Sequence, residues 1–232
     1  MNAEVGAQQS GATEDVKECR ADSGQPVCPR LSGWQLVLKR VFDLVVSIAV
    51  LPLAMVLGLI SAILIKVDSP GPVFFKQQRI GKDGTPFLLY KFRSMFKDAD
   101  AIVEKLKDLN EAEGPIFKIK KDPRITRAGA ILRKTSMDEL PQLMNVIKGD
   151  MSLVGPRPPL PREVDKYTDY QRGRLAVKPG LTCLWQVQGR SSIPFDKWVE
   201  LDLEYIRIQS LWLDLKILLK TIPAVLKGTG AW

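Results

Sequence analysis

One uncharged run of 22 residues, from Leu44 to Ile65, restricts the fold of this chain more than any other feature. Only Ser47, Pro52, Gly58 and Ser61 interrupt its apolar side chains. As a straight helix the run would reach about 33 Å, close to the thickness of a bilayer core. A buried helix in a soluble protein is the alternative, and it would need apolar neighbours on every side. The run therefore predicts a membrane segment.

Positive charge flanks both ends of this run. Lys39 and Arg40 precede it, and Lys66, Lys76, Arg79 and Lys82 follow it. Positive charge favours the cytoplasmic side of a membrane, and here it stands at both ends of the run. Pro52 removes a backbone donor and could turn the helix back to the face it entered, as a re-entrant hairpin. An ordinary kinked span is the alternative that these residues leave open.

The absence of histidine limits the chemistry. Acid, base, nucleophile and metal-ligand roles must fall to carboxylate, Lys, Cys, Tyr or Ser, and a His-based triad is excluded. Cys19, Cys28 and Cys183 form no CxxC pair, which argues against a zinc site or a disulfide framework and favours a reducing, cytoplasmic setting. The net charge of +8 favours phosphate or anionic lipid as partners, although basic charge also serves solubility alone.

The rest of the chain predicts a small mixed domain. Residues 1–33 lack apolar periodicity and a signal-peptide core, which predicts a mobile tail. Val73 to Ile80 and Pro86 to Phe92 enclose an Asp-Gly turn, the pattern of a β-hairpin. Helices are predicted over 97–112 and over Ile131 to Ile147, the second broken early by Pro141. The segment 156–194 is dense in Pro and Gly and predicts ordered loop.

Two amphipathic helices are predicted near the C-terminus. Trp198, Leu201, Tyr205 and Ile208 mark one face of the first, and Leu211 to Leu226 is apolar on most sides. Helices of this kind lie in a membrane interface or pack against the catalytic core. Both interpretations stay open at this point.

The segment from Arg133 to Pro141 has two interpretations. Ser136 followed by Glu139 is the pattern of a capping box, which would make Asp138 an ordinary first-turn acid. The same helix start would offer backbone N–H groups to a phosphate, and neighbouring Asp and Glu can share Mg²⁺. An ionised Asp138 can attack phosphorus without a base, while Arg133, Lys134 and Arg157 could neutralise phosphate oxygens.

In their order along the chain, these segments resemble the bacterial sugar transferases, also called monotopic phosphoglycosyl transferases. The resemblance extends from about Lys39 to Trp232. Its motifs are Lys39-Arg40-Val41-Phe42-Asp43, Ser69-Pro70-Gly71-Pro72, Gln78-Arg79-Ile80-Gly81, Tyr90-Lys91-Phe92-Arg93-Ser94-Met95, Ser136-Met137-Asp138-Glu139-Leu140-Pro141-Gln142, Asn145-Val146-Ile147-Lys148-Gly149-Asp150-Met151-Ser152, Val154-Gly155-Pro156-Arg157-Pro158, Lys178-Pro179-Gly180-Leu181-Thr182, Trp185-Gln186-Val187 and Gly189-Arg190-Ser191. Each motif alone is weakly specific, whereas the ordered set is highly specific. Two positions depart from the family pattern: Met55-Val56 stands where Ser-Pro usually breaks the membrane helix, and Cys183 stands where Gly is common.

The resemblance implies a two-step reaction. Asp138 attacks the β-phosphate of a UDP-sugar and releases UMP, and undecaprenyl phosphate then accepts the phosphosugar. It implies Mg²⁺ bound by Asp138 and Glu139, and substrate contacts by Lys91, Arg133, Arg157 and Arg190. The C-terminal Gly228-Thr229-Gly230-Ala231-Trp232 and the segment Leu211-Trp212-Leu213-Asp214-Leu215-Lys216 resemble the branch that transfers a hexose such as glucose or galactose. Such a step would begin the synthesis of exopolysaccharide, capsule or O-antigen.

The resemblance also implies a topology. The expected fold is α+β, mostly helical with a small β-hairpin, attached to one face of the membrane by a re-entrant N-terminal helix and by interfacial amphipathic helices. The expected parts are a tail over 1–38, the membrane helix over 39–66 and the cytoplasmic catalytic domain over 67–232, the minimal catalytic form of the family. Membrane lipid, undecaprenyl phosphate and UDP-sugar are the expected partners at the inner membrane, and a homodimer is compatible with the resemblance.

Two rival functions use fewer of these residues. A non-catalytic membrane-bound scaffold or binding module would need only the basic surface and the apolar segments, and it predicts no turnover. Nucleic-acid binding through basic residues is disfavoured by the membrane run and the scattered charge, so no nucleic-acid partner is expected.

Overall fold

The computed structural model of the protein describes residues 29–99, 101–102, 104–111, 114–117, 119, 121–189 and 193–227. Its α-helices are α1 (Trp34–Asp68), α2 (Arg127–Lys134), α3 (Leu143–Lys148), α4 (Pro161–Val164), α5 (Asp169–Arg172), α6 (Leu184–Gln188), α7 (Phe195–Ile208) and α8 (Leu211–Lys227). The 3-10 helices are η1 (Lys82–Gly84), η2 (Glu104–Leu109), η3 (Met137–Gln142) and η4 (Gly173–Ala176). The strands are β1 (Phe74–Ile80), β2 (Pro86–Phe92), β3 (Ser152–Val154) and β4 (Gly180–Thr182). The predicted α+β class, mostly helical with a small sheet, is confirmed.

The predicted hairpin is also confirmed. Strands β1 and β2 pair antiparallel, with Phe75 opposite Lys91 and Arg79 opposite Phe87. The connection η1 holds Asp83 at φ 55 and Gly84 at φ 81, the left-handed backbone that Asp-Gly turns provide. Because residues directly opposite each other share a face, Arg79, Leu89 and Lys91 all lie on one face of the hairpin.

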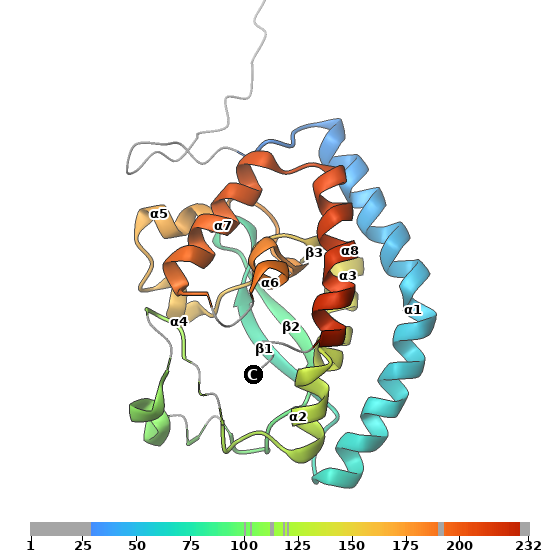
Figure 1. The fold of residues 1–232 in the computed structure, drawn as a ribbon, viewed down its shortest axis with the longest axis vertical. Helices are drawn as coiled ribbons and strands as arrows, with labels where there is room; N and C mark the ends of the chain where they lie inside the picture. The colour runs from blue at the N-terminus through green and yellow to red at the C-terminus, as the bar shows by residue number, and fades with distance from the viewer. Residues whose placement is uncertain are drawn as a thin grey trace, which may run out of the picture.

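Helix α1 turns its polar side toward the protein and its apolar side outward. Its buried residues are Lys39, Asp43, Ser47, Ala54, Ser61 and Ile65, spaced four or seven apart on one face. The outward face exposes large apolar side chains along the whole length, from Trp34 to Val67. Figure 1 shows α1 as one curved helix along an edge of the molecule. By length and composition it could cross a membrane. It starts at Trp34, before the predicted boundary at Lys39, and continues through Pro52, so the described helix does not show the break that a hairpin would need.

Buried polar contacts fix both ends of α1 to the rest of the protein. Lys39 Nζ donates to Asp214 Oδ2 at 2.5 Å and to the carbonyl oxygen of Val154 at 3.2 Å. Asp43 accepts from the backbone N–H of Leu153. At the other end, the Asp68 carboxylate accepts from the backbone N–H of Ala128 in the first turn of α2. The charges that the sequence places beside a membrane run are therefore also docking contacts.

The segment from Ile131 to Ile147 is three short helices, which corrects the predicted single helix broken at Pro141. Helix α2 ends at Lys134, and the chain turns at Ser136, whose φ of 55 lies in the left-handed region. Pro141 lies inside η3, and α3 follows directly. Because Ser136 makes no side-chain cap hydrogen bond, the predicted capping box is not formed.

The segment 156–194 is more structured than predicted. It contains α4, α5, η4, β4 and α6, and β4 pairs in parallel with β3. This pairing depends on two glycines, since a Cβ on Gly180 would lie 2.1 Å from the backbone nitrogen of Gly155. The helix predicted over 97–112 is wrong for the described residues, which contain only η2.

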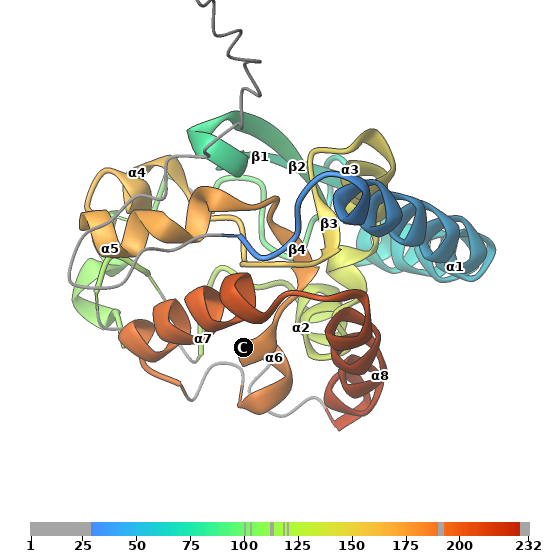
Figure 2. The ribbon, with the colours of Figure 1, turned by 90° about the horizontal axis from the view of Figure 1, so that it is seen from above.

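The main core lies where α7 and α8 meet α6 and the β3–β4 pair. Figure 2 shows α7 and α8 on the side opposite the hairpin, with β3 and β4 between. Trp198 of α7 stacks on Trp185 of α6 with ring centroids 4.2 Å apart. Trp198, Leu201 and Tyr205 are buried as predicted for one face, whereas Ile208 is exposed. Helix α7 therefore packs against the core, while α8 keeps Trp212, Leu219 and Ile222 exposed.

Candidate functional site

A carboxylate pair on η3 faces a lysine on β2. Lys91 Nζ donates to Glu139 Oε1 at 2.7 Å and lies 3.9 Å from Asp138 Oδ2. The left-handed turn at Ser136 ends α2 and starts η3, and this change of direction places both acids against the hairpin. Asp138 is 6% exposed and Glu139 is partly exposed. The structure therefore brings three of the predicted site residues into contact.

Asp138 and Glu139 differ in their electrostatics. Burial raises the pKa of Asp138 to about 6, although Lys91 opposes the shift. Burial also opposes the ionisation of Glu139, but the charges of Lys91 and Arg157 outweigh it and lower the pKa of Glu139. At neutral pH both groups are ionised. Of the two, Asp138 is the less stabilised anion and is not hydrogen-bonded to Lys91, so it is the more available nucleophile.

Arg133 and Arg157 also act on this pair. Arg133 donates from Nε to Ser94 Oγ at 3.1 Å, and burial lowers its pKa while the charge of Asp138 raises it. Arg157 lies in the loop after β3 and lowers the pKa of both acids. Lys134, also predicted to neutralise phosphate, is exposed and does not line the pocket described below, and Arg190 lies outside the described residues.

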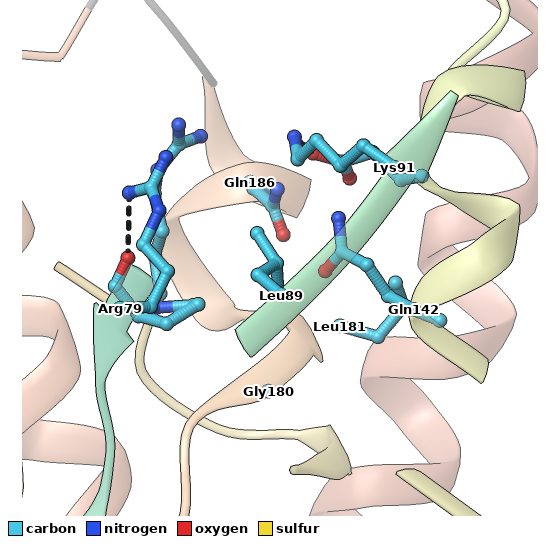
Figure 3. A pocket seen from close by; sticks show the side chains of 10 residues that line it. Arg79, Leu89, Lys91, Gln142, Gly180, Leu181 and Gln186 are labelled. Atoms are coloured by element: carbon cyan, nitrogen blue, oxygen red, sulfur yellow. Dashed lines mark hydrogen bonds and ion pairs between the residues drawn. The ribbon is translucent and has the colours of Figure 1, made fainter. Parts of the chain in front are cut away.

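A pocket opens beside the pair (Figure 3). It is lined by Arg79, Leu89, Lys91, Glu139, Gln142, Arg157, Pro158, Gly180, Leu181 and Gln186. Its space of about 280 Å³ includes open solvent, so it is an open depression whose cationic and amide side chains face a ligand from the solvent side.

Three polar lining residues were not among the predicted site residues: Arg79, Gln142 and Gln186. Alternation along the hairpin could have indicated Arg79, because the pairing around the Asp-Gly turn places it on the same face as Lys91. Gln142 is buried on η3 four residues after Asp138. Gln186 lies on α6, and its side-chain oxygen accepts from the Cys183 thiol. No local pattern brings these two amides to the site, because they come from separate elements.

The residues present fit a magnesium ion only with help from a substrate. Within the described ranges, no group of three or more Asp, Glu, His or Cys side chains could hold a metal. Mg²⁺ commonly takes one or two carboxylates, substrate phosphate oxygens and water. Asp138 and Glu139 supply such a pair, and Glu139 is paired with Lys91 in this structure. The donor set is thus compatible with Mg²⁺ that arrives with a phosphate ligand.

Comparison with known proteins finds a matching family. Residues 34–228 match the family described as bacterial sugar transferase. The chain is 48% identical over 197 residues to "Galactosyl transferase CpsE" of Streptococcus agalactiae, covering 84% of this chain and 44% of that protein. It is 44% identical over 203 residues to "Undecaprenyl-phosphate galactose phosphotransferase" of Salmonella typhimurium, covering 84% and 42%.

A relative of similar length matches over nearly its whole chain. "Uncharacterized sugar transferase EpsL" of Bacillus subtilis is 43% identical over 195 residues, covering 84% of this chain and 90% of that protein. The chain spans less than half the length of the two relatives described before it. Glu139, Lys91 and Arg157 line one pocket, and Asp138 lies beside Lys91. Because the family match covers most of the chain, the protein belongs to the bacterial sugar transferase family.

Proposed function

We propose that the protein transfers a hexose 1-phosphate from a UDP-hexose to undecaprenyl phosphate and releases UMP. The observation that carries this proposal is the buried Asp138 carboxylate beside the Lys91–Glu139 ion pair, at the edge of a pocket with Arg157. The names of two relatives specify galactose, which favours a hexose donor over an acetamido sugar. The reaction would be the first membrane step of a surface polysaccharide.

The first half-reaction is a displacement at phosphorus. An Asp138 oxygen forms a bond to the β-phosphorus of the donor, and the bond from that phosphorus to the bridging oxygen breaks. The bridging oxygen keeps the electron pair and leaves as part of UMP. The hexose phosphate remains on Asp138 as an acyl phosphate. Lys91 lies 3.9 Å from the attacking carboxylate and can neutralise charge on the equatorial oxygens, as can Arg157.

The second half-reaction restores the enzyme. A phosphate oxygen of undecaprenyl phosphate attacks the same phosphorus, and the bond to Asp138 breaks. The carboxylate recovers its electron pair, and the product is an undecaprenyl diphosphate hexose. No proton transfer from Asp138 is needed in either step, which is consistent with a chain that contains no histidine.

Asp138 and Glu139 would hold Mg²⁺ together with the donor diphosphate. When bound, the ion would neutralise phosphate charge and help to orient the diphosphate. Lys91 would then exchange part of its contact with Glu139 for contact with the phosphate, since both the lysine and the metal use the Glu139 carboxylate.

Membrane attachment is proposed through the outward faces of α1 and α8. Both faces expose large apolar side chains, including Trp34 and Val67 on α1 and Trp212, Leu219 and Ile222 on α8. Lys216 lies over the Trp212 ring at 5.2 Å, an arrangement suited to the lipid headgroup region. The site would face the cytoplasm at the inner membrane, where the nucleotide donor is available. Assembly as a homodimer remains a prediction.

The contacts at both ends of α1 support attachment from one side. Lys39 and Asp43 bind the β3 and α8 region, and Asp68 binds the start of α2 in the same domain. A helix docked at both ends to one domain keeps both ends on the side where that domain lies. These contacts support a monotopic arrangement, which we propose without the predicted re-entrant break. In a cysteine-free background, thiols placed at Gly33 and Val67 should react with a membrane-impermeant reagent from the same side, and labelling from opposite sides would refute this topology.

A UMP-release assay tests the proposed function. Purified full-length protein is incubated with Mg²⁺, undecaprenyl phosphate and a panel of UDP-sugars. The expected result is multiple-turnover UMP release that depends on the acceptor, is greatest with UDP-glucose or UDP-galactose and is abolished by Asp138→Asn. Asp165→Asn, which changes an exposed carboxylate, is the matched control and should retain activity. Absence of turnover with every donor would favour the non-catalytic scaffold instead.

A further inference from the structure

Arg79 is a buried arginine without a carboxylate partner among the described residues. It is 7% exposed and its guanidinium is fixed by two hydrogen bonds, to the carbonyl oxygen of Pro158 at 2.9 Å and to Gln77 Oε1 at 2.7 Å. Its Nε is buried and has no hydrogen-bond partner within the described chain. By contrast, Arg124 and Arg174 are buried against Asp122 and Asp202, each with a contact of 2.6 Å. Arg79 is therefore a positioned cation without a compensating anion in contact.

A second arginine shares its pocket. Arg157 lines the same pocket and its charge acts on Arg79. Burial first, and the charge of Arg157 second, lower the pKa of Arg79 to about 10, although the charges of Glu163 and Glu139 act in the opposite direction without contacting Arg79. Two guanidinium groups that repel each other in a partly closed pocket would be stabilised by an anion between them. In Figure 3 Arg79 lies on the opposite side of the pocket from Lys91.

The diphosphate of the proposed donor has two phosphates, and the pocket has two cationic sides. The phosphate attacked by Asp138 must lie near Lys91, because Lys91 Nζ is 3.9 Å from the attacking carboxylate. The other phosphate, one bridging oxygen away, can extend toward Arg79 and Arg157. When the bridging bond breaks, negative charge develops on this second phosphate as UMP leaves, and prepositioned guanidinium groups stabilise such charge.

We propose that Arg79 binds the phosphate of the leaving nucleotide, together with Arg157, and so acts in the first half-reaction only. This inference rests on the proposed function. The second half-reaction contains no nucleotide, so it does not use this subsite. Arg79 is thus a substrate-binding residue for UMP and for the donor, and it does not act on the acceptor.

The primary test compares UMP binding by calorimetry in full-length wild-type protein, Arg79→Gln and Arg79→Lys. Arg79→Gln should weaken UMP binding roughly 10- to 100-fold, the range for losing a hydrogen-bonded charge contact, and Arg79→Lys should weaken it less. Arg93→Lys is the matched control. Arg93 is also buried at the hairpin and bonded to the Ser69 and Pro70 carbonyls, but it does not line the pocket. If Arg79→Gln does not fold, Arg79→Lys decides the question.

A rate measurement separates binding from a structural role. The covalent hexose phosphate is allowed to form from UDP-hexose and, after removal of nucleotide, is chased with undecaprenyl phosphate. Arg79 variants should slow formation of the covalent intermediate by about the same factor by which they weaken UMP binding. They should leave the rate of transfer to undecaprenyl phosphate unchanged. Unchanged UMP affinity, or equal slowing of both half-reactions, would overturn the proposal. If wild-type protein forms no intermediate, the proposed function fails, while the UMP titration still reports on Arg79.

Discussion

Replacing Asp138 by asparagine should stabilise the folded protein at neutral pH while it removes activity. The carboxylate is buried, and burial raises its pKa to about 6 from an ordinary value of 3.8. A folded-state pKa above the unfolded-state value means that ionisation favours the unfolded chain. The destabilisation is fully present above pH 6 and is lost as the pH falls toward 3.8. Asparagine has nearly the same shape and carries no charge, so it removes this penalty.

The size of the effect follows from the two pKa values. A difference of about two units corresponds to about 3 kcal/mol, because each unit is worth about 1.4 kcal/mol. The Lys91, Arg133 and Arg157 charges already offset part of the burial penalty, and their contribution is included in the folded-state value. For a chain of this size, 3 kcal/mol corresponds to a rise in Tm of roughly 6–12 °C.

Thermal unfolding in detergent micelles measures this difference. The Tm of Asp138→Asn should exceed the Tm of wild type at pH 7.5, and the gap should narrow as the pH is lowered toward 4. Asp165→Asn, at an exposed carboxylate, should show no such gap. If Asp138→Asn is no more stable than wild type at pH 7.5, the carboxylate is not penalised by burial and the electrostatic account of the site is wrong.

Three further results are expected. Because the attacking carboxylate must be ionised, kcat/KM for UDP-hexose should fall about tenfold per pH unit below 6. Lys91→Met should move the midpoint of this pH profile to higher pH, because Lys91 opposes the rise in the pKa of Asp138. A flat profile down to about pH 5 would contradict this expectation. Asp214→Leu should lower the free energy of unfolding by about 3 kcal/mol, because buried Lys39 loses its closest carboxylate and keeps only Asp43 at 3.9 Å, and chemical denaturation would measure the loss. Gly129→Ala should prevent normal folding, since its Cβ would lie 1.9 Å from the backbone oxygen of Ser94. Ala130→Ser, on the exposed side of the same helix, is the control and should unfold at nearly the wild-type temperature.

The elements that local patterns predict correctly are those whose geometry is local. Alternation and an Asp-Gly turn specify the hairpin, and its observed strands differ from the predicted ones by a single residue. The three-residue strands β3 and β4 were missed because their pairing joins positions 28 residues apart and depends on the close approach of Gly155 and Gly180. No periodicity can develop in so short a strand.

In helix α1, tertiary contacts give residues a structural role that the sequence does not reveal. From the sequence, Lys39 is a charge beside a membrane run, because its partner Asp214 lies 175 residues away. The break at Ser136 is likewise invisible locally, since serine rarely adopts a positive φ and Pro141 offers a more obvious break. The position of the acidic pair was nevertheless predicted, because ordered family motifs identify it independently of where each helix ends.

The residues of the candidate site were likewise only partly predictable from the sequence. Asp138, Glu139, Lys91, Arg133 and Arg157 were predicted and do converge. From the sequence, Arg79 was a positive charge after the membrane run and a member of a family motif. Its burial, and its bond to the carbonyl of Pro158, depend on a loop far along the chain. Buried polar residues that line a pocket emerge only from the assembled fold.

The central claim is that Asp138 carries the hexose phosphate, and mass spectrometry of the protein after incubation with UDP-hexose and Mg²⁺ tests it most directly. Without undecaprenyl phosphate, wild-type protein should gain the mass of one hexose phosphate, and peptide mapping should place that mass on Asp138. Adding undecaprenyl phosphate should remove it. An adduct on another residue, an adduct that persists in Asp138→Asn, or UMP release with no adduct at any time would contradict the covalent mechanism.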